Sequence, residues 1–280
     1  MSNLGERSET AGIQKPPSDA IYVFPELYEL AFSYRDYALE CDRLESWYAL
    51  ASGRNTRPSS ILELAAGPAD HAIELARRGA RSSTLDLSPS MCEHARSRSR
   101  KAGVSLDVHA GDMTEFSLNR TFDLAFLMLS SISHIHELDR VVAHMKSVAR
   151  HLGPDGIYCV ETTHPRDFLG RGPRTTGVAV PWTVESGGRK LTVRWGRPDD
   201  PYDLIKQVFD CRIELTLEER DSVRVFEDHF KMRDLTYNEL TTAARSAGLE
   251  LRASYGDFER NLPLDHEEAW RMILLFGPQR

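Results

Sequence analysis

The chain has 280 residues, of which 41% are hydrophobic, 28% charged and 9% aromatic, a composition typical of globular proteins and not of disordered or fibrous ones. Its 35 basic and 42 acidic residues give a net charge of −7, which argues against a broad nucleic-acid-binding face. No apolar run approaches the roughly 18 residues of a membrane helix, and the N-terminus lacks the apolar segment of a secretory signal. We therefore expect a cytoplasmic protein that does not contact a membrane.

Cysteine and histidine spacings give no metal or disulfide signature. The four cysteines contain no CxxC pair, so we interpret them as reduced thiols. The histidines show neither HxxxH nor HExxH spacing, and the close pair His134 and His136 has no evident third ligand. We predict no bound metal.

The first 165 residues divide into three parts. Residues 1–19 are polar, and we expect a disordered tail. From residue 20 to about 52, the apolar spacing predicts helices that cover the following domain. After that, short apolar runs alternate with helix-length segments, which is the pattern of a parallel sheet. The runs are 61–65, 81–87, 104–109, 122–129 and 157–162.

From residue 166 to 232 the pattern changes to alternating apolar and polar residues, which is typical of half-buried antiparallel strands. Leu191, Val193 and Trp195 alternate in this way, and positions 209–217 continue the pattern over a longer span. A third alternation begins at Val223 and changes face near Glu227, which we interpret as a β-bulge. We predict an inserted antiparallel β lid over 166–232, which leaves 20–165 and 233–280 as the core.

The last part of the chain predicts one helix and two strands. Thr236 and Glu239 have the spacing of a capping box, and the helix they open should end near Gly248. The apolar runs 249–255 and 270–276 are joined by a polar stretch without a helical stripe. Because a parallel crossover needs a helix there, we expect an antiparallel hairpin. The predicted fold class is α/β, a doubly wound Rossmann-like sheet with an inserted lid.

The loop after the first run gives the clearest functional signal. Ala65 and Gly67 are small enough for the backbone to approach a flat ligand at the carboxyl edge of the sheet. Asp86 ends the second run, where an acidic side chain can bind ribose hydroxyls. A third glycine of the dinucleotide pattern would fall at Asp70, whose carboxylate would repel a diphosphate. With Glu63 also close by, the positively charged S-adenosylmethionine is favoured over NAD.

Residues 60–165 and 236–276 resemble the class I S-adenosylmethionine-dependent methyltransferases. ILELAAGPADHA resembles the first motif of that family, TLDLSPSM its second-strand acidic motif, and HAGDMTEF its adenine-side motif. FDLAFLMLSSISHI, HLGPDGIYCVETTHP and GLELRASYGDF followed by AWRMILLF complete the match in the family's order. The resemblance implies seven strands with the last one antiparallel. It also implies methyl transfer to an oxygen or nitrogen of a small molecule by in-line displacement.

The resemblance further implies which residues bind the methyl donor. Gly67 would face its methionyl part, Asp86 its ribose and Leu87 the adenine face, with Asp112 and Met113 beside the adenine. The family has glycine at the position of Ala65, and an alanine adopts a positive φ less readily, so the geometry of this turn stays open. The remaining expected cofactor contacts are Ala65 and Glu63 near the first loop, Leu129 after the fourth run, and Tyr22, Tyr34 and Arg35 in the N-terminal cover.

Acceptor chemistry is expected at three places. The segment 128–136 leaves the fourth run beside the methyl position, so His134 is the first candidate general base and His136 the second. The alternative is that either histidine only caps a loop. His164, at a strand end, and Trp182 and Trp195, on the lid, are candidate substrate contacts, although for the two tryptophans the core of the lid itself is the favoured alternative.

Other functions are weighed on the same residues. The fourth run continues as LSSI and lacks the tetrad with which amino methyltransferases grip a flipped base, so no nucleic-acid partner is expected. Two rivals stay open: an NAD-dependent oxidoreductase, and a non-catalytic S-adenosylmethionine-binding protein. We expect a monomer or homodimer.

Overall fold

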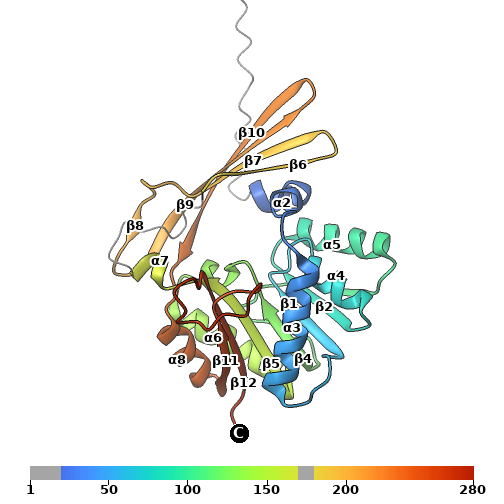
Figure 1. The fold of residues 1–280 in the computed structure, drawn as a ribbon, viewed down its shortest axis with the longest axis vertical. Helices are drawn as coiled ribbons and strands as arrows, with labels where there is room; N and C mark the ends of the chain where they lie inside the picture. Colours follow the sequence, from blue (N-terminus) through green and yellow to red (C-terminus); the bar gives the residue numbers. More distant parts are fainter. Residues whose placement is uncertain (1–19, 170–179) are drawn as a thin grey trace, which may run out of the picture.

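The computed structural model describes residues 20–169 and 180–280 (Figure 1), so the tail expected at 1–19 lies outside the described residues. A seven-stranded sheet forms the lower half of the molecule in this view. Its strands are β1 (Ser60–Leu64), β2 (Arg81–Asp86), β3 (Leu106–Ala110), β4 (Phe122–Leu127), β5 (Leu152–Thr163), β11 (Leu249–Tyr255) and β12 (Arg271–Pro278). They lie in the order β11-β12-β5-β4-β1-β2-β3. β12 is antiparallel to both of its neighbours, which confirms the predicted fold class and closing hairpin.

The described helices are α1 (Ala20–Val23), α2 (Pro25–Ala31), α3 (Tyr37–Ser52), α4 (Asp70–Arg77), α5 (Pro89–Ala102), η1 (Ser131–His134), α6 (Leu138–Arg150), α7 (Arg166–Leu169) and α8 (Tyr237–Ser246). Of these, α3, α4 and α5 cover one face of this sheet, and α6 and α8 cover the other. Successive side chains of a strand point to opposite faces. Accordingly, Ile61 joins a core with α3, α4 and α5, whereas Leu62 joins another with α6 and α8. The predicted caps are confirmed at Ser88, which accepts from Met91 N, and at Thr236, where both capping-box bonds form.

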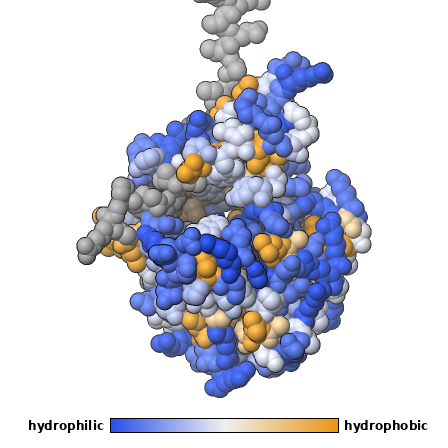
Figure 2. All heavy atoms as spheres, viewed as in Figure 1, coloured by the Kyte–Doolittle hydropathy of each residue, from blue (hydrophilic) through white to orange (hydrophobic). Residues whose placement is uncertain are grey.

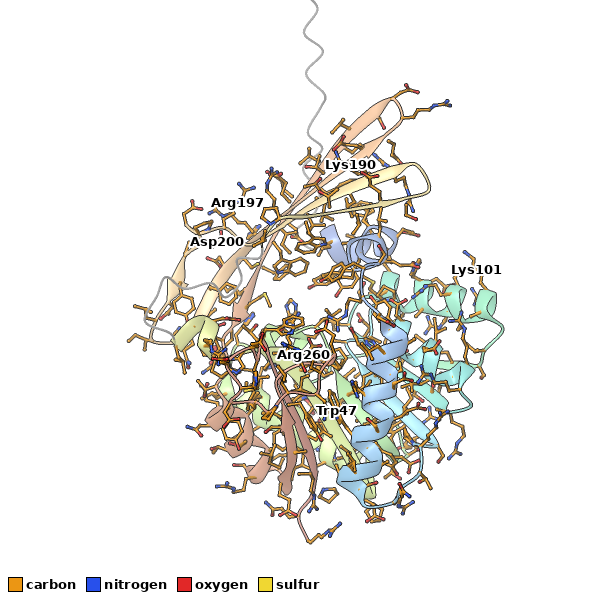
Figure 3. The ribbon with its side chains drawn as sticks, in the orientation of Figure 1. Trp47, Lys101, Lys190, Arg197, Asp200 and Arg260 are labelled. Carbon is orange, nitrogen blue, oxygen red and sulfur yellow. The ribbon has the colours of Figure 1, made fainter. Side chains whose placement is uncertain are left out.

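The closing hairpin is held from the helical side. Trp47, on α3, lies against β11 and β12 (Figure 3). Its indole stacks on Tyr255 with 4.5 Å between ring centroids and donates a hydrogen bond to Asn261 Oδ1 at 2.6 Å. The hairpin and its loop are thereby fixed to the face that α3 covers.

A second sheet stands above the first in Figure 1. Its strands are β6 (Trp182–Ser186), β7 (Arg189–Trp195), β8 (Tyr202–Asp203), β9 (Val208–Glu219) and β10 (Ser222–Arg233). The predicted bulge near Glu227 is wrong, because β9 and β10 pair without a register shift from Ser222 to Arg233. Val223 lies on the outer face and is 58% exposed, whereas Asp228 on the opposite face is buried. The two alternations are therefore the two faces of one regular strand.

The second sheet shares a hydrophobic core with the N-terminal helices. Ile21 and Leu27 of α1 and α2 pack with Leu191, Val193 and Leu215 of the second sheet in a cluster separate from the two cores of the first sheet. The cover predicted from residue 20 onward is thus divided, since α3 covers the seven-stranded sheet and α1 and α2 pack under the second one.

Three composition-based expectations can be compared with the structure. All four cysteines are free and buried, as predicted. No helix within 20–169 and 180–280 combines the length and the apolar character that a bilayer span requires. The same ranges hold no group of three or more His, Cys, Asp or Glu side chains arranged to bind a metal ion.

Candidate active site

A cavity of about 1360 Å³ lies between the carboxyl edge of the seven-stranded sheet, the N-terminal helices and the second sheet. Figure 2 shows the molecule hollowed between its upper and lower parts. Most residues that the sequence placed in the site line this cavity: Tyr22, Tyr34, Ala65, Gly67, Asp86, Leu87, Asp112, Met113, Leu129, His134, His136, Trp182 and Trp195. Three of the predicted site residues, Arg35, Glu63 and His164, do not belong to its wall.

The first loop wraps around the carboxylate that ends β2. The Gly67 amide donates to Asp86 Oδ2 at 2.7 Å, and the Ser88 amide donates to Oδ1 at 2.8 Å. Burial raises the pKa of the Asp86 carboxyl, and these amides oppose that effect. Ala65 and Ala69 adopt φ of 46° and 62°, which costs roughly 1–2 kcal/mol for each L-residue. The turn thus adopts the left-handed conformation at both positions, although alanine stands there in place of the family's glycine. The energetic cost is typical of functional loops.

The opposite end of this wall follows β3. Asp112 accepts hydrogen bonds from the amide and hydroxyl of Thr114, both at 2.7 Å, and pairs with Arg140 at 2.6 Å. Burial would raise the pKa of Asp112, but these contacts lower it below its usual range. Leu87 also lines the cavity and is 73% exposed. The wall therefore presents an apolar side chain as well as the fixed carboxylate of Asp112.

Tyr22, predicted as a cofactor contact, and His134, predicted as a general base, meet across the cavity wall. The Tyr22 hydroxyl and His134 Nε2 lie 3.0 Å apart and share one hydrogen bond, whose donor depends on the His134 tautomer. Burial, assisted by His136, lowers the pKa of His134 to about 4, and burial raises the pKa of Tyr22 well above its usual value. Both groups are therefore uncharged at neutral pH. His136 points elsewhere, since its Nε2 bonds to the Lys231 carbonyl of β10 at 2.8 Å.

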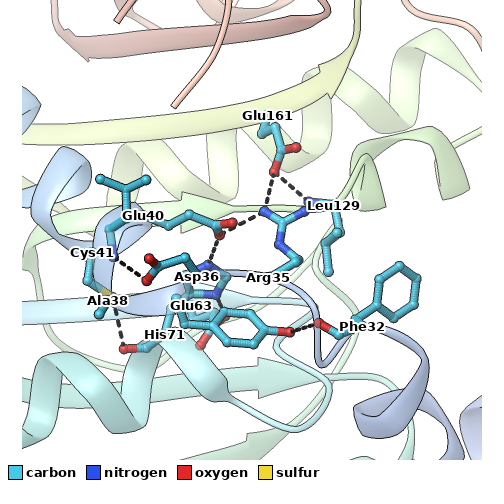
Figure 4. A network of polar contacts seen from close by, with 12 residues as sticks. Phe32, Arg35, Asp36, Ala38, Glu40, Cys41, Glu63, His71, Leu129 and Glu161 are labelled. Carbon is cyan, nitrogen blue, oxygen red and sulfur yellow. Dashed lines mark hydrogen bonds and ion pairs between the residues drawn. The ribbon is translucent and has the colours of Figure 1, made fainter. Parts of the chain in front are cut away.

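Behind the first loop lies a buried network of alternating charges (Figure 4). Arg35 pairs with Glu40 at 2.7 Å, Glu40 contacts His71 Nε2 at 2.7 Å, and His71 Nδ1 contacts Glu63 at 3.0 Å. Arg35 also reaches Glu161 at 3.6 Å. The sequence predicted cofactor contacts at Arg35 and Glu63, but the structure places both in this network, where they hold α3 and α4 to β1.

Glu161 connects the network to the histidine loop. Its Oε2 accepts the Leu129 amide at 2.9 Å, and its Oε1 lies 3.1 Å from Arg271 Nε. Leu129 and Ser130 both adopt φ of 56°, which is unusual for L-residues with side chains. This turn leads directly into η1 and His134. The fully buried carboxylate thus supports the strained backbone from which His134 projects.

Two further residues differ from their expected roles. His164 is occupied by backbone, since Nε2 contacts the Leu264 carbonyl at 3.0 Å and Nδ1 accepts the Arg166 amide at 3.1 Å. Asp70 pairs with Arg98 at 2.7 Å and is not part of the described cavity wall. The argument that the Asp70 carboxylate repels a diphosphate is therefore wrong, because its charge is compensated on α5.

The charges of other residues in the described cavity wall nevertheless favour S-adenosylmethionine over a phosphate-bearing cofactor. Its arginines are already paired, Arg140 with Asp112 and Arg271 with Glu161. The same described part of the wall carries the carboxylates of Asp86, Asp112, Glu137 and Asp167, of which Asp112 is balanced by Arg140. This distribution of charge fits a ligand with a sulfonium and an ammonium group better than a phosphate-bearing one.

Several aromatic residues of the cavity were missed by the sequence analysis. Tyr28, Phe32 and Phe230 line it together with the predicted tryptophans. Tyr28 lies on α2, Phe32 directly after it and Phe230 on β10. That these distant segments face one cavity follows only from the tertiary fold.

Comparison with known proteins identifies the family. The family model described as "Methyltransferase domain" matches residues 61–156. A dTDP-3-amino-3,6-dideoxy-alpha-D-glucopyranose N,N-dimethyltransferase of Streptomyces fradiae is 33% identical over 192 residues, covering 68% of this chain and 69% of that protein. A dTDP-4-amino-2,3,4,6-tetradeoxy-D-glucose N,N-dimethyltransferase of Saccharopolyspora spinosa is 23% identical over 268 residues, covering 91% and 94%.

Solved structures share the fold over nearly the whole chain. An S-adenosylmethionine-dependent methyltransferase from Clostridium acetobutylicum superimposes with a TM-score of 0.74 at 16% identity, covering 93% of this chain and all of that one. Streptomyces venezuelae DesVI does so with a TM-score of 0.73 at 22% identity, covering 90% and 97%.

The chain belongs to the class I S-adenosylmethionine-dependent methyltransferases. It is an enzyme that uses S-adenosylmethionine as methyl donor and a small molecule as acceptor, and the two rival functions are not favoured.

Proposed function

We propose that this methyltransferase acts on the nitrogen of an amine, in an acceptor such as an amino sugar. The observation that supports nitrogen is the uncharged Tyr22–His134 pair at the edge of an aromatic cavity. A deprotonated amine is already a good nucleophile, so a neutral imidazole that accepts one proton suffices. The relatives named above are both N,N-dimethyltransferases of amino sugars, which favours two successive transfers here as well.

Each part of the cavity wall then has a role. S-adenosylmethionine, when bound, supplies an electrophilic methyl group on a sulfonium. We assign Asp86 to its ribose hydroxyls, Gly67 and Ala65 to its methionyl side, and Leu87, Asp112 and Met113 to its adenine. Leu129 and Tyr34 border the same space.

The acceptor side is formed by the second sheet. Within the predicted lid, 166–232, Trp182 and Trp195 contact the acceptor, and the lid excludes water from the transfer. His134 receives the proton that the amine loses, and Tyr22 orients the imidazole ring. His136, bonded to β10, fastens the histidine loop to the lid.

The test uses two acceptors that differ in one atom. We would incubate the protein with methyl-¹³C-labelled S-adenosylmethionine and a 3-amino-3,6-dideoxyglucoside, and in parallel with the matching 3-hydroxy sugar, each free and dTDP-linked. We expect N-¹³CH₃ signals and mass gains of one and two methyl groups from the amine alone. Methylation of the hydroxy sugar, with the amine unchanged, would exclude the nitrogen assignment.

A further inference from the structure

Five aromatic side chains at the roof of the cavity form a closed circuit. Tyr22 contacts Tyr28 with 6.0 Å between ring centroids, and Tyr28 contacts Phe32 at 4.7 Å. Phe32 contacts Trp195 at 5.7 Å, Trp195 contacts Phe230 at 5.8 Å, and Phe230 returns to Tyr22 at 5.7 Å. All five line the cavity. We call this set the aromatic ring.

The aromatic ring is assembled from two parts of the chain. Tyr22, Tyr28 and Phe32 come from α1, α2 and the residue after α2, whereas Trp195 and Phe230 come from β7 and β10 of the second sheet. Phe32 is buried, and the other four keep partial exposure within the core shared by these elements. Part of the surface of these four side chains therefore faces the cavity and is not covered by the surrounding core.

The dimensions of the aromatic ring suit a cation. Five centroids joined by sides of this length lie on average no more than about 5 Å from their common centre, within the roughly 6 Å over which a cation is attracted to an aromatic face. Several aromatic faces around one point form the type of site that recognises alkylated ammonium groups.

We propose that the aromatic ring is a cage for the acceptor nitrogen in its methylated, positively charged form, which retains the product of the first transfer for the second. This inference rests on the proposed amine N-methylation. Tyr28 borders the cofactor loop, since a Cβ placed on Gly67 would lie 3.8 Å from its ring, and Tyr22 borders His134. The cage thus lies between the residues assigned to the methyl donor and the residue assigned to the proton.

The chemistry of each transfer matches this position. The nitrogen lone pair forms the new N–C bond, the C–S bond breaks with its electron pair going to sulfur, and positive charge appears on nitrogen. The aromatic faces stabilise that charge as it develops. Loss of the ammonium proton to His134, and from there to solvent, restores the lone pair for the second transfer, while the added methyl group increases contact with the ring.

Binding of simple probes tests the cage directly. In the presence of S-adenosylhomocysteine, we would titrate the unmodified protein with choline and with its uncharged isostere 3,3-dimethylbutan-1-ol, and follow tryptophan fluorescence and calorimetric heat. We expect choline to bind about 5- to 30-fold more tightly. Equal affinity for the two probes would overturn the cage, even if amine methylation is observed.

Variants then link the cage to the second transfer. In Trp195→Leu we expect choline to lose its advantage and the ratio of monomethyl to dimethyl product to rise several-fold. Trp195→Phe, which keeps an aromatic face, should restore most of both. The matched control is Trp270→Leu, a cavity tryptophan outside the aromatic ring that stacks on Arg271 at 4.4 Å.

The outcomes separate the two proposals. If Trp195→Leu does not fold, Phe230→Leu and the probe pair on the unmodified protein still decide the question. An unchanged product ratio in a folded Trp195→Leu would overturn the role in the second transfer. Preferential choline binding without any N-methylated product would instead exclude the proposed function and leave the cation site standing.

Discussion

The Tyr22 hydroxyl lies 3.0 Å from His134 Nε2, although the two residues are 112 positions apart. Tyr22 belongs to a helix that packs under the second sheet, and His134 to the turn that follows β4. The contact therefore joins the core of the second sheet to the carboxyl edge of the seven-stranded sheet.

Replacing His134 by alanine should lower kcat by about 100-fold with a good amine acceptor, because a positioned base contributes at least that much. Tyr22→Phe removes only the orienting hydroxyl and should cost about tenfold. Calorimetric titration with S-adenosylhomocysteine should give unchanged affinity for both. If the alanine variant turns over normally with intact cofactor affinity, His134 is not the base.

The pH dependence of kcat/KM should show no inflection from His134 between pH 5.5 and 8. Burial, with a contribution from His136, lowers the pKa of His134 to about 4, so the imidazole is already deprotonated throughout this range. The rise in rate should instead follow the pKa of the acceptor amine and shift when acceptors of different basicity are used. An inflection near pH 6.5 that disappears in His134→Ala would contradict this.

Asp86→Asn should weaken S-adenosylhomocysteine binding by about 10- to 100-fold, because hydrogen bonds to a charged acceptor contribute roughly 1.5–3 kcal/mol. The matched control is Asp70→Asn, since Asp70 pairs with Arg98 and is not part of the described cavity wall. We expect its affinity to stay within about twofold. Calorimetry of both variants checks this, and similar losses at both positions would refute the assignment.

Glu161→Gln should lower the stability of the protein and the rate together. The side chain is fully buried between Arg35 and Arg271, and removing one charge of a buried group of ions costs about 3–5 kcal/mol. The neutral side chain also accepts the Leu129 amide less strongly than the carboxylate does, which loosens the histidine turn, so kcat should fall more than KM changes. Denaturant unfolding measures the first effect. The control, Asp155→Asn, breaks an exposed pair with Arg54 and should leave the free energy of unfolding nearly unchanged.

Stability should decrease as the pH rises from 6.5 to 9. Burial alone would lower the pKa of His71, but its hydrogen bonds with Glu40 and Glu63 raise the pKa to about 9. Because the folded pKa exceeds the unfolded one, protonated His71 stabilises the fold fully below about pH 6.5, and this contribution, about 3 kcal/mol, is lost through pH 9. Urea unfolding at several pH values should show this decline, and His71→Gln should flatten it. Parallel curves for both proteins would refute it.

The positions of the strands along the chain, the caps and the closing hairpin could be predicted from the sequence because each depends on local periodicity or on neighbours in the chain. The loop after β1 and the position of Asp86 at the end of β2 were also predicted. In contrast, Arg35 and Glu63 have the chemistry of ligand contacts, yet each meets an internal partner of opposite charge. Sequence does not show which partner a buried charge will find, and so it assigned these residues to the cofactor.

The second sheet shows the same limit in another form. The alternation at Val223 indicated a bulge because an apolar residue was expected to face inward, whereas it lies near the tip of a hairpin on the solvent side. The aromatic ring could not be predicted either, because its members are separated by up to about two hundred positions and meet only when α1 and α2 pack under β7 and β10.

That packing has a consequence for how the protein matures. Ile21 and Leu27 are synthesised early, but their partners on β7 and β9 emerge much later in translation, after the strands that form most of the large sheet. Contacts so distant in sequence form slowly, because the entropy cost of closing a long loop comes before the contact can stabilise the fold. The core that joins α1 and α2 to the second sheet should therefore form late, well after β1–β5 have left the ribosome.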